Sequence, residues 1–492
     1  MKFTVKDSLK DEEIQSGLGA VVKDGLASQA MVTLTGGAFL VAFALKLGAS
    51  NLVIGLLAAI PPLTQLIQIP SIYLVEKIRN RRTISFFGSA SSRIFWLVIA
   101  LLPFLFSTEA RLTFFLLAMV LNSSFAAVSN CSWNSWMRDL VPQDRLGRFF
   151  SRRMSLSMIL GIALSMGAGI YVDYWKKLFP DYELYGYSIL FSLGFLAGIL
   201  GVYFISTIPE PRMAPIEEKG NFYGLLSKPF RDGNFRNLIM FLGSWNFAVN
   251  LAAPFFTVYM LKWLQLKMSF IIALLILSQI MNLAFLRIWG RFSDRFSNKS
   301  VLSVSGPLFI ICILAWTFTT MPEKYQLTIP LLIAIHIFMG ISTAGIALAS
   351  GNIGLKLAPK GQATAYLSAN SLINSIAAGI GPVLGGIFAD FFAGRELSWT
   401  LRYTSPGGEL SLQTLNLQQW DFFFFLAFLI GLYSIHRLAM VKEVGQIEEK
   451  IGVRELISEV RREMRNLSTA GGIRQMVHFP FTIVRHLKTR KK

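Results

Sequence analysis

The loop sequence Asp294-Arg295-Phe296-Ser297-Asn298-Lys299 has a counterpart in the first half of the chain, Glu76-Lys77-Ile78-Arg79-Asn80-Arg81, at an offset of 218 in the numbering. Two further pairs of segments match at an offset of 217, namely Leu140-Val141-Pro142 with Leu357-Ala358-Pro359, and Gly169-Ile170-Tyr171-Val172-Asp173-Tyr174 with Gly386-Ile387-Phe388-Ala389-Asp390-Phe391. Three ordered matches at nearly one offset indicate a duplicated architecture. We therefore expect a chain of two related halves.

The composition is that of a membrane protein. Of the 492 residues, 53% are hydrophobic and 15% are charged, whereas a soluble domain carries about 25% charged residues. A helix needs about 20 apolar residues to cross a bilayer. Twelve segments qualify, at residues 26–47, 51–75, 84–107, 113–137, 154–172, 186–207, 237–261, 268–286, 300–320, 327–353, 363–389 and 419–436. Together with the repeat, they predict an all-α membrane protein with twelve transmembrane helices in two pseudo-symmetric six-helix bundles.

Lysine and arginine are distributed unevenly between the two sides of the membrane. Loops on the side of both termini hold 37 of the 47 Lys and Arg residues, the other side holds nine, and Arg93 lies within a span. Because basic loops resist translocation, we expect an integral protein of the bacterial inner (plasma) membrane with both termini in the cytoplasm. The net charge of +19 then reflects topology, and no nucleic acid is expected as a partner.

The expected domain boundaries follow from these spans. They are a cytoplasmic N-terminus at 1–23, a bundle at 24–207, a polar linker at 208–236, a second bundle at 237–439 and a tail at 440–492. The tail combines helical spacing of apolar residues with a basic end, which should attract anionic lipid headgroups. Residues 398–415 alternate around Ser405-Pro406-Gly407-Gly408, which predicts a hairpin outside the membrane.

Two motifs resemble the major facilitator superfamily, and the resemblance covers about residues 20–440. Gly290-Arg291-Phe292-Ser293-Asp294-Arg295-Phe296-Ser297-Asn298-Lys299 is similar to its cytoplasmic loop motif, with Ser297 and Asn298 in place of Gly and Arg. Gly379-Ile380-Gly381-Pro382-Val383-Leu384-Gly385-Gly386 is similar to its glycine-rich signature. The resemblance implies a secondary transporter that works by alternating access, with helices 1, 4, 7 and 10 around one central cavity.

Polar and aromatic side chains gather on these four helices, and several amides are spaced i,i+4, so that they share a face. The candidate substrate-binding residues are Gln29, Thr33, Asn130, Trp133, Asn134, Trp245, Asn246, Asn250 and His336. Hydrogen bonding between helices is the alternative role for each amide. Amides and tryptophans with few charges favour a neutral polyhydroxylated or zwitterionic solute, and a sugar-like one is preferred.

Two other functions fit the same fold. A flippase for an amphiphile would need a lateral opening between helices 5 and 8 or between helices 2 and 11. A non-transporting membrane assembly or pigment-handling protein would need a central cavity filled by Phe and Trp. An enzyme is not expected, because the sequence has no nucleophile–base constellation, nucleotide-binding loop or metal-ligand cluster. No cofactor is expected, the partners are a small-molecule substrate and the lipid bilayer, and a monomer is one option for the oligomeric state.

Charged groups inside the spans are scarce, and no carboxylate is expected there. The candidates for coupling transport to an ion are Arg93 and His336 inside spans and Asp24, Asp173 and Asp390 at span ends. We expect a structural partner for Arg93 on helix 2 or 4, with neutralisation of an anionic substrate as the alternative. Helix packing or proton transfer are the two roles open to His336. Facilitated diffusion is the alternative to coupling.

The two related loops provide candidates for a latch that holds one closed state, namely Glu76, Lys77, Asp294, Arg295 and Lys299. A carboxylate at a helix end can bind a neighbouring helix terminus or an arginine. The alternative is that these residues only anchor the topology, since basic residues there also satisfy the positive-inside rule.

Overall fold

The computed structural model describes residues 5–7, 9–142, 146–213, 222–320, 326–359, 363–406 and 408–443. Within these ranges, twelve helices are long and apolar enough to cross a membrane, which confirms the number of spans expected from the sequence. The predictions for the basic tail concern residues 444–492, which lie outside the described residues.

The first bundle contains six spans. Its helices are α1 (Asp11–Thr35), α2 (Gly37–Lys46), α3 (Asn51–Thr64), α4 (Gln68–Ile78), α5 (Arg81–Leu105), α6 (Thr108–Leu140), α7 (Leu146–Leu178) and α8 (Glu183–Thr207), with 3-10 turns at Gln65–Ile67 and Pro180–Tyr182. The first span is divided at Gly36 into α1 and α2, and Gly37 takes a positive φ of 55° at the break. The second span is divided by the 3-10 turn at Gln65–Ile67, where Pro70 has no N–H to donate to the Leu66 carbonyl inside the turn.

The second bundle repeats this arrangement after a short helix in the linker, α9 (Phe222–Arg231). Its helices are α10 (Gly233–Val258), which continues as a π-helical turn at Tyr259–Trp263, α11 (Met268–Arg295), α12 (Asn298–Thr317), α13 (Thr328–Leu357), α14 (Ala363–Phe392) and α15 (Trp420–Ala439). Strand β1 (Val5–Lys6) pairs with β2 (Glu210–Pro211) in parallel. Strand β3 (Glu396–Ser405) pairs antiparallel with β4 (Gly408–Gln418), as predicted for the hairpin.

The repeat is visible in the element boundaries. Helices α3 and α11, α5 and α12, and α7 and α14 begin at an offset of 217, and α6 and α13 end at the same offset. This offset holds through the loop after α4 and α11, so Asp294 corresponds to Lys77. The offset of 218 expected for that loop, which pairs Asp294 with Glu76, is therefore wrong by one position.

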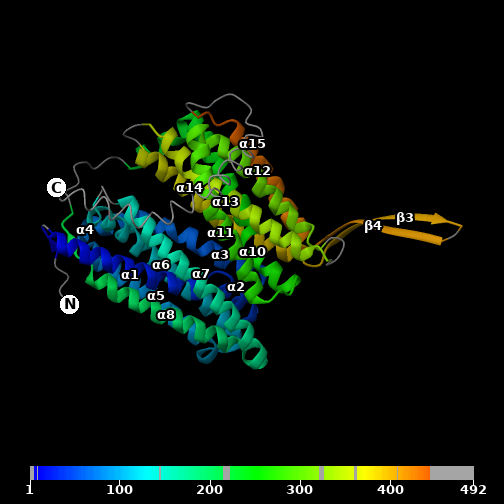
Figure 1. Ribbon diagram of the computed structural model, residues 1–492, viewed down its shortest axis with the longest axis horizontal. Helices are drawn as coiled ribbons and strands as arrows, with labels where there is room; N and C mark the ends of the chain where they lie inside the picture. Colours follow the sequence, from blue (N-terminus) through cyan, green and yellow to red (C-terminus); the bar gives the residue numbers. More distant parts are fainter. Residues whose placement is uncertain are drawn as a thin grey trace, which may run out of the picture.

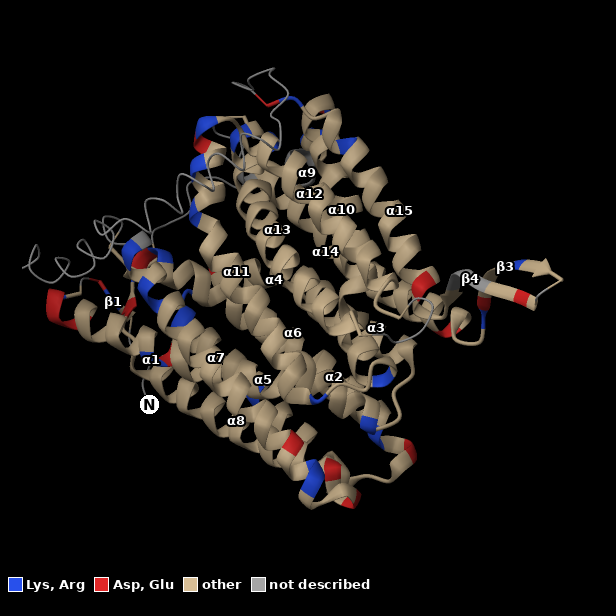
Figure 2. Ribbon diagram, turned by 45° about the vertical axis from the view of Figure 1, so that its right-hand side comes forward, with Lys and Arg blue, Asp and Glu red and all other residues tan. Residues whose placement is uncertain are grey.

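The bundles meet at one end of the molecule and separate toward the other (Figure 1). We call the end where α1 begins the terminus end, and the opposite end, where β3 and β4 project, the hairpin end. In Figure 2 the charged residues lie mainly at these two ends of the helices. The most extensive contacts between the bundles pair α3 with α14 and α7 with α11, and α10 also touches α2 and α3.

The two inter-bundle seams are packed differently. Helix α14 carries the glycine-rich segment, and a Cβ at Gly386 would collide with the backbone of Asn51 on α3. A Cβ at Gly55 on α3 would likewise collide with the backbone of Pro382 on α14. Close backbone approach of this kind needs small residues. The α3–α14 seam is therefore tight, whereas cavities lie along the α7–α11 seam.

Candidate functional site

Helix α6 presents the candidate amides Asn130 and Asn134 as exposed side chains. One flank of this strip contacts α4, because the thiol of Cys131 lies 3.8 Å from a backbone carbonyl there. The other flank contacts α7, where the guanidinium of Arg153 covers the Trp133 ring at 5.0 Å from its centroid. The two amides therefore lie on an exposed strip of α6 between α4 and α7, and a role for them in substrate binding stays a prediction.

The candidates on α10 are satisfied within their own bundle. The Asn246 side chain donates to the Leu242 carbonyl at 2.8 Å, and the Asn250 side chain donates to the Asn246 carbonyl at 2.8 Å. Trp245 is buried, and its ring centroid lies 5.6 Å from that of Phe309. In this conformer Trp245 belongs to the packing core, and a role for it in substrate binding stays a prediction.

The candidates on α1 line a cavity. Gln29 Nε2 donates to Thr33 Oγ1 at 3.1 Å, and both residues border a cavity of about 230 Å³ between α1, α7 and α11. At the offset of the repeat, Gln29 and Thr33 are equivalent to Asn246 and Asn250, so both bundles carry a polar i,i+4 pair at the same place.

The environment of His336 is that of a packed side chain. The residue is 4% exposed, its Nδ1 lies 2.8 Å from the Leu332 carbonyl, and its ring meets Trp316 at a centroid distance of 5.6 Å. Trp316 in turn belongs to a cluster of rings inside the second bundle, with Phe256, Tyr259 and Phe424. These rings fill the bundle and not the space between bundles.

A buried ionic cluster connects four helices of the first bundle. Asp24 on α1 is 3% exposed and Arg93 on α5 is 6% exposed. Arg93 Nη2 lies 3.5 Å from Asp24 Oδ1 and donates to Ser28 Oγ at 2.8 Å, and its Nη1 donates to the Gly198 carbonyl on α8. Arg153 Nη2 on α7 lies 3.9 Å from the second oxygen of Asp24. One carboxylate therefore serves two arginines.

Two expectations about this cluster are wrong. Helix α1 begins at Asp11, so Asp24 lies within a helix and is buried, and does not sit at the end of a span. Arg93 has its partners on α1 and α8, and not on the second or fourth span. Nothing in the sequence singles out Arg153, whose connection to Asp24 depends on how α7 packs against α1.

The second bundle has no such pair at the equivalent positions. Phe241 and Ile310 occupy the positions that correspond to Asp24 and Arg93, and both are buried. Apolar residues of similar volume often replace a buried ion pair without loss of stability. The fold therefore does not require charges at these positions, and the pair Asp24–Arg93 needs another explanation.

Asp173 and Asp390 join the bundles at the hairpin end. The carboxylate of Asp173, near the end of α7, accepts the first two backbone N–H groups of α11 at 2.9 and 2.8 Å. The carboxylate of Asp390, near the end of α14, accepts those of α3 at 3.2 and 2.9 Å. A carboxylate at a helix N-terminus satisfies orphan donors and matches the helix dipole. These two residues close the hairpin end, and a role for them in coupling stays a prediction.

The predicted latch residues lie at the open terminus end. Glu76 and Asp294 are exposed, and in the described part of the chain no ion pair joins the two bundles there. Lys299 Nζ donates to the Ala439 carbonyl, and the Arg295 guanidinium covers the Phe296 ring, both within one bundle. A latch between bundles stays a prediction for a conformer that is closed at this end.

Sequence reasoning missed an acidic anchor in each bundle. In the first, Glu210 accepts from Arg81 Nε at 2.8 Å and from the Arg82 backbone N–H at 2.7 Å, and Arg81 also pairs with Asp139. The Arg81–Glu210 pair is fully buried. Burial raises the pKa of Glu210 even though Arg81 opposes the shift. The sequence feature that could have indicated this role is the position of Glu210, which directly follows the last helix of the first half.

The anchor of the second bundle is Glu443, which follows α15. It accepts from the Lys299 backbone N–H at 2.8 Å, from Asn298 Nδ2 at 3.0 Å and from Lys356 Nζ at 2.8 Å. Burial alone would raise the pKa of Glu443, but these three hydrogen bonds outweigh it and lower the pKa below 4.5. Lys356 is the repeat equivalent of Asp139, so the two anchors have opposite charges at one equivalent position.

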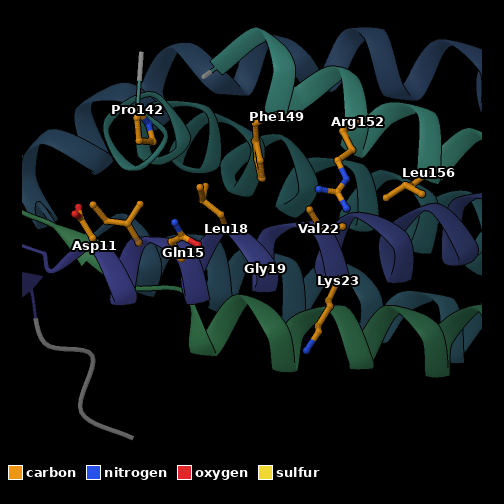
Figure 3. Close-up of a pocket in the computed structure, with 11 residues that line it drawn as sticks. Asp11, Gln15, Leu18, Gly19, Val22, Lys23, Pro142, Phe149, Arg152 and Leu156 are labelled. Atoms are coloured by element: carbon orange, nitrogen blue, oxygen red, sulfur yellow. The ribbon is translucent and has the colours of Figure 1, made fainter. Parts of the chain in front are cut away.

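Three cavities follow α7 and the first span, which consists of α1 and α2, from one end of the molecule to the other. At the terminus end, a cavity of about 710 Å³ is lined by Leu18, Phe149 and Arg152, among others (Figure 3). The cavity at Gln29 lies in the middle, and a cavity of about 970 Å³ lies at the hairpin end beside Asp173. The last two also border α11, so the α7–α11 seam is the more open of the two lateral interfaces.

Comparison with known families agrees with this geometry. The family model "Major Facilitator Superfamily" matches residues 25–382 and 247–491. An "MFS-type transporter" of Aspergillus terreus (strain NIH 2624 / FGSC A1156) is 30% identical over 130 residues, which are 26% of this chain and 22% of that protein. The chain thus matches about a fifth of the length of this relative.

Solved structures share the fold. The nucleoside transporter NupG superposes with a TM-score of 0.60 at 13% identity, over 88% of this chain and all of that one. A bacterial homologue of the iron transporter ferroportin in an inward-facing state gives 0.60 at 12% identity, over 88% and 99%. A bacterial homologue of the lysosomal transporter Spinster, inward-facing and unoccupied, gives 0.57 at 15%, over 78% and 84%. With twelve spans in two repeated bundles and the family match across them, the chain is an integral membrane protein that belongs to the Major Facilitator Superfamily.

Proposed function

We propose that this protein is a proton-coupled secondary transporter that moves a small polar solute by alternating access, with Asp24 as the group that binds the coupling proton. The observation that carries the proposal is the buried Asp24–Arg93 pair at positions where the second bundle has Phe241 and Ile310. An ionisable residue inside a transporter is a functional candidate because its burial is costly.

The mechanism follows from the arrangement of two arginines around one carboxylate. With Asp24 ionised, it holds Arg93 on α5 and Arg153 on α7 at once. Protonation of Asp24 removes the charge that joins these helices, and Arg153, which also covers Trp133, is then free to respond to a solute beside Asn130 and Asn134. A two-state element biased by a local charge is the usual form of such a switch.

The substrate class is part of the proposal. Exposed amides on α6 and the Gln29–Thr33 pair beside a cavity suit a neutral polyhydroxylated or zwitterionic solute, and a sugar-like solute is preferred. The excess of Lys and Arg at the terminus end supports a cytoplasmic position of that end in a bacterial inner membrane. The present conformer is then closed to the outside and open to the cytoplasm.

The test begins with a panel of solutes and thermal unfolding of the purified protein. A ligand at about 100 times its dissociation constant stabilises the protein by about 2.7 kcal/mol. Uptake of a stabilising solute is then measured in proteoliposomes with and without a pH gradient. We expect gradient-driven accumulation in wild type and in Asp421→Asn, a buried carboxylate of the second bundle, and equilibration without accumulation in Asp24→Asn. Accumulation that survives in Asp24→Asn would refute the coupling role.

A second candidate function is supported by the cavities along the α7–α11 seam. The polar head of an amphiphile could pass along this seam while its chain stays in the lipid. This seam, between the fifth span (α7) and the eighth span (α11), is one of the two lateral openings expected of a flippase. The measurement is the loss of a fluorescent lysophospholipid from one leaflet of proteoliposomes. Leaflet exchange above that of protein-free vesicles, with no stabilisation by any soluble solute, would favour this function over the first.

A further inference from the structure

The cavity at the hairpin end gathers lysines. Its volume is about 970 Å³, and α2, α7 and α8 of the first bundle and the start of α11 with the turn before it from the second bundle border it. Five lysines line it: Lys46, Lys176, Lys177, Lys262 and Lys267. The loops on this side of the membrane hold nine Lys and Arg residues in all, so more than half of them lie around one cavity.

The acidic residues of the cavity neutralise only part of this charge. Glu183 pairs with Lys46 and lies 3.7 Å from Lys176. Both oxygens of Asp173 are used by the backbone N–H groups at the start of α11. Among the described residues, no carboxylate is paired with the other three lysines, Lys177, Lys262 and Lys267.

Comparison of the two halves of the repeat shows whether closure of the hairpin end requires these lysines. The contact of Asp390 with α3 closes the hairpin end in the same way as the contact of Asp173 with α11. The positions equivalent to the five lysines, at an offset of 217, are Trp263, Ala393, Gly394, Leu45 and Ser50. None of these is charged, so closure between the bundles does not need the lysines. Topology does not explain them either, because basic residues are disfavoured on this side.

We infer that this cavity binds an anionic ligand with at least two negative charges, of the phosphate or carboxylate class. Lys177 comes from α7, whereas Lys262 and Lys267 come from the turn before α11 and from the residue before its start, so one ligand would touch both bundles. Lysine is a mobile point charge that suits such oxyanions. A ligand that bridges the bundles stabilises the conformer closed at the hairpin end, because it binds that conformer better than an open one.

Two sources supply this chemistry, and neither depends on the transported solute. One is a soluble polyanion that enters from the hairpin end. The other is the headgroup of an anionic lipid, which could lie against the exposed rim residue Tyr174 beside the seam.

The experiment uses the full-length protein in nanodiscs of phosphatidylcholine, with inorganic pyrophosphate as the soluble probe and thermal unfolding as the measurement. A second set of nanodiscs contains phosphatidylglycerol in place of part of the neutral lipid. The variants are Lys262→Gln with Lys267→Gln, the single variant Lys177→Gln, and Arg402→Gln. Arg402 lies on the hairpin on the same side but outside the cavity, which makes it the matched control.

We expect stabilisation of wild type and Arg402→Gln, and about tenfold weaker binding for the double variant, equivalent to about 1.4 kcal/mol. Lys177→Gln should show a smaller loss in the same direction, which preserves the test if the double variant fails to fold. A response to pyrophosphate identifies a soluble ligand, and a response to phosphatidylglycerol alone identifies a lipid headgroup. Equal responses of the lysine variants and Arg402→Gln to both probes would overturn the inference.

Discussion

The two bundles share one fold but differ in what occupies equivalent interior positions. The first holds Asp24 and Arg93 between its helices, and the second holds Phe241 and Ile310. Equivalent helices pack around the charged pair in one bundle and around the apolar pair in the other. Side-chain shape and volume therefore determine the packing at these positions, and the charges are not needed for it. A repeat of this kind separates residues that the fold needs from residues kept for another reason.

The strongest test of this comparison makes the first bundle resemble the second. Asp24→Asn alone should destabilise the protein by about 3 kcal/mol, because it leaves the buried Arg93 and the half-buried Arg153 without their counter-charge. The double variant Asp24→Leu with Arg93→Met restores an apolar pair and should recover most of that loss. Thermal unfolding in detergent measures both. A double variant less stable than Asp24→Asn would mean that the bundle needs the charges for packing.

The second test compares the two contacts that close the hairpin end. Asp173→Ala and Asp390→Ala should each weaken closure by about 1 kcal/mol, the usual value of a helix N-cap, and shift the ratio of closed to open conformers about fivefold. Distances between spin labels on α7 and α11, and on α14 and α3, report the change. Asp181→Asn, an exposed carboxylate on the same side, is the control.

Salt should distinguish the two contacts. Asp173 lines the same cavity as five lysines, so its loss removes a negative charge that offsets the repulsion between Lys177 on one bundle and Lys262 on the other. That repulsion is screened over a Debye length of about 10 Å at 0.1 M salt. The effect of Asp173→Ala should therefore shrink as salt rises, whereas that of Asp390→Ala should stay nearly constant. An equal salt dependence would show that the lysines do not act on closure.

The smallest effects are expected at the acidic anchors near the terminus end. The folded-state pKa of Glu443 is lowered, so its contribution to stability is present above pH 4.5 and is lost as pH falls through the folded value. The pKa of Glu210 is raised, so its contribution is present below pH 4.5 and declines as pH rises. Because Lys356 is half exposed, the Glu443 contribution is at most about 1 kcal/mol.

The measurement for the anchors is the unfolding temperature of Glu443→Gln and Glu210→Gln against pH, each relative to wild type. The deficit of Glu443→Gln should vanish on acidification below pH 4.5. The deficit of Glu210→Gln should not follow that course, since burial opposes the charged form in wild type. Parallel pH curves would contradict the difference between the anchors.

Hydropathy and the repeat were sufficient to predict the twelve spans and the pairing of the halves, because each span needs only a long apolar segment. They did not predict that α1 starts at Asp11. Residues 11–25 are too polar to be recognised as part of a span, yet α7 and α8 cover one face of them. For this reason Asp24 was expected outside the helix core.

The partners of individual side chains could not be predicted from the sequence either. Asp24 and Arg93 are 69 residues apart, and their contact depends on the rotation of α1 against α5. The i,i+4 rule predicts that Asn130 and Asn134 share a face, and both are exposed on α6. The same rule applies to Asn246 and Asn250, but it does not predict that each of these amides donates to a carbonyl of its own helix.

The contacts of Asp173 and Asp390 also bear on how the protein tolerates mutation. In each contact the donors at the receiving helix are backbone N–H groups, supplemented in one case by the Asn51 side chain. Almost any residue can supply a backbone N–H, so substitutions at the starts of α3 and α11 should rarely abolish these bonds unless they introduce proline. A random mutational screen for variants that leak at the hairpin end should therefore find substitutions of Asp173 and Asp390. It should find few substitutions in the first residues of α11 and α3, which these carboxylates contact.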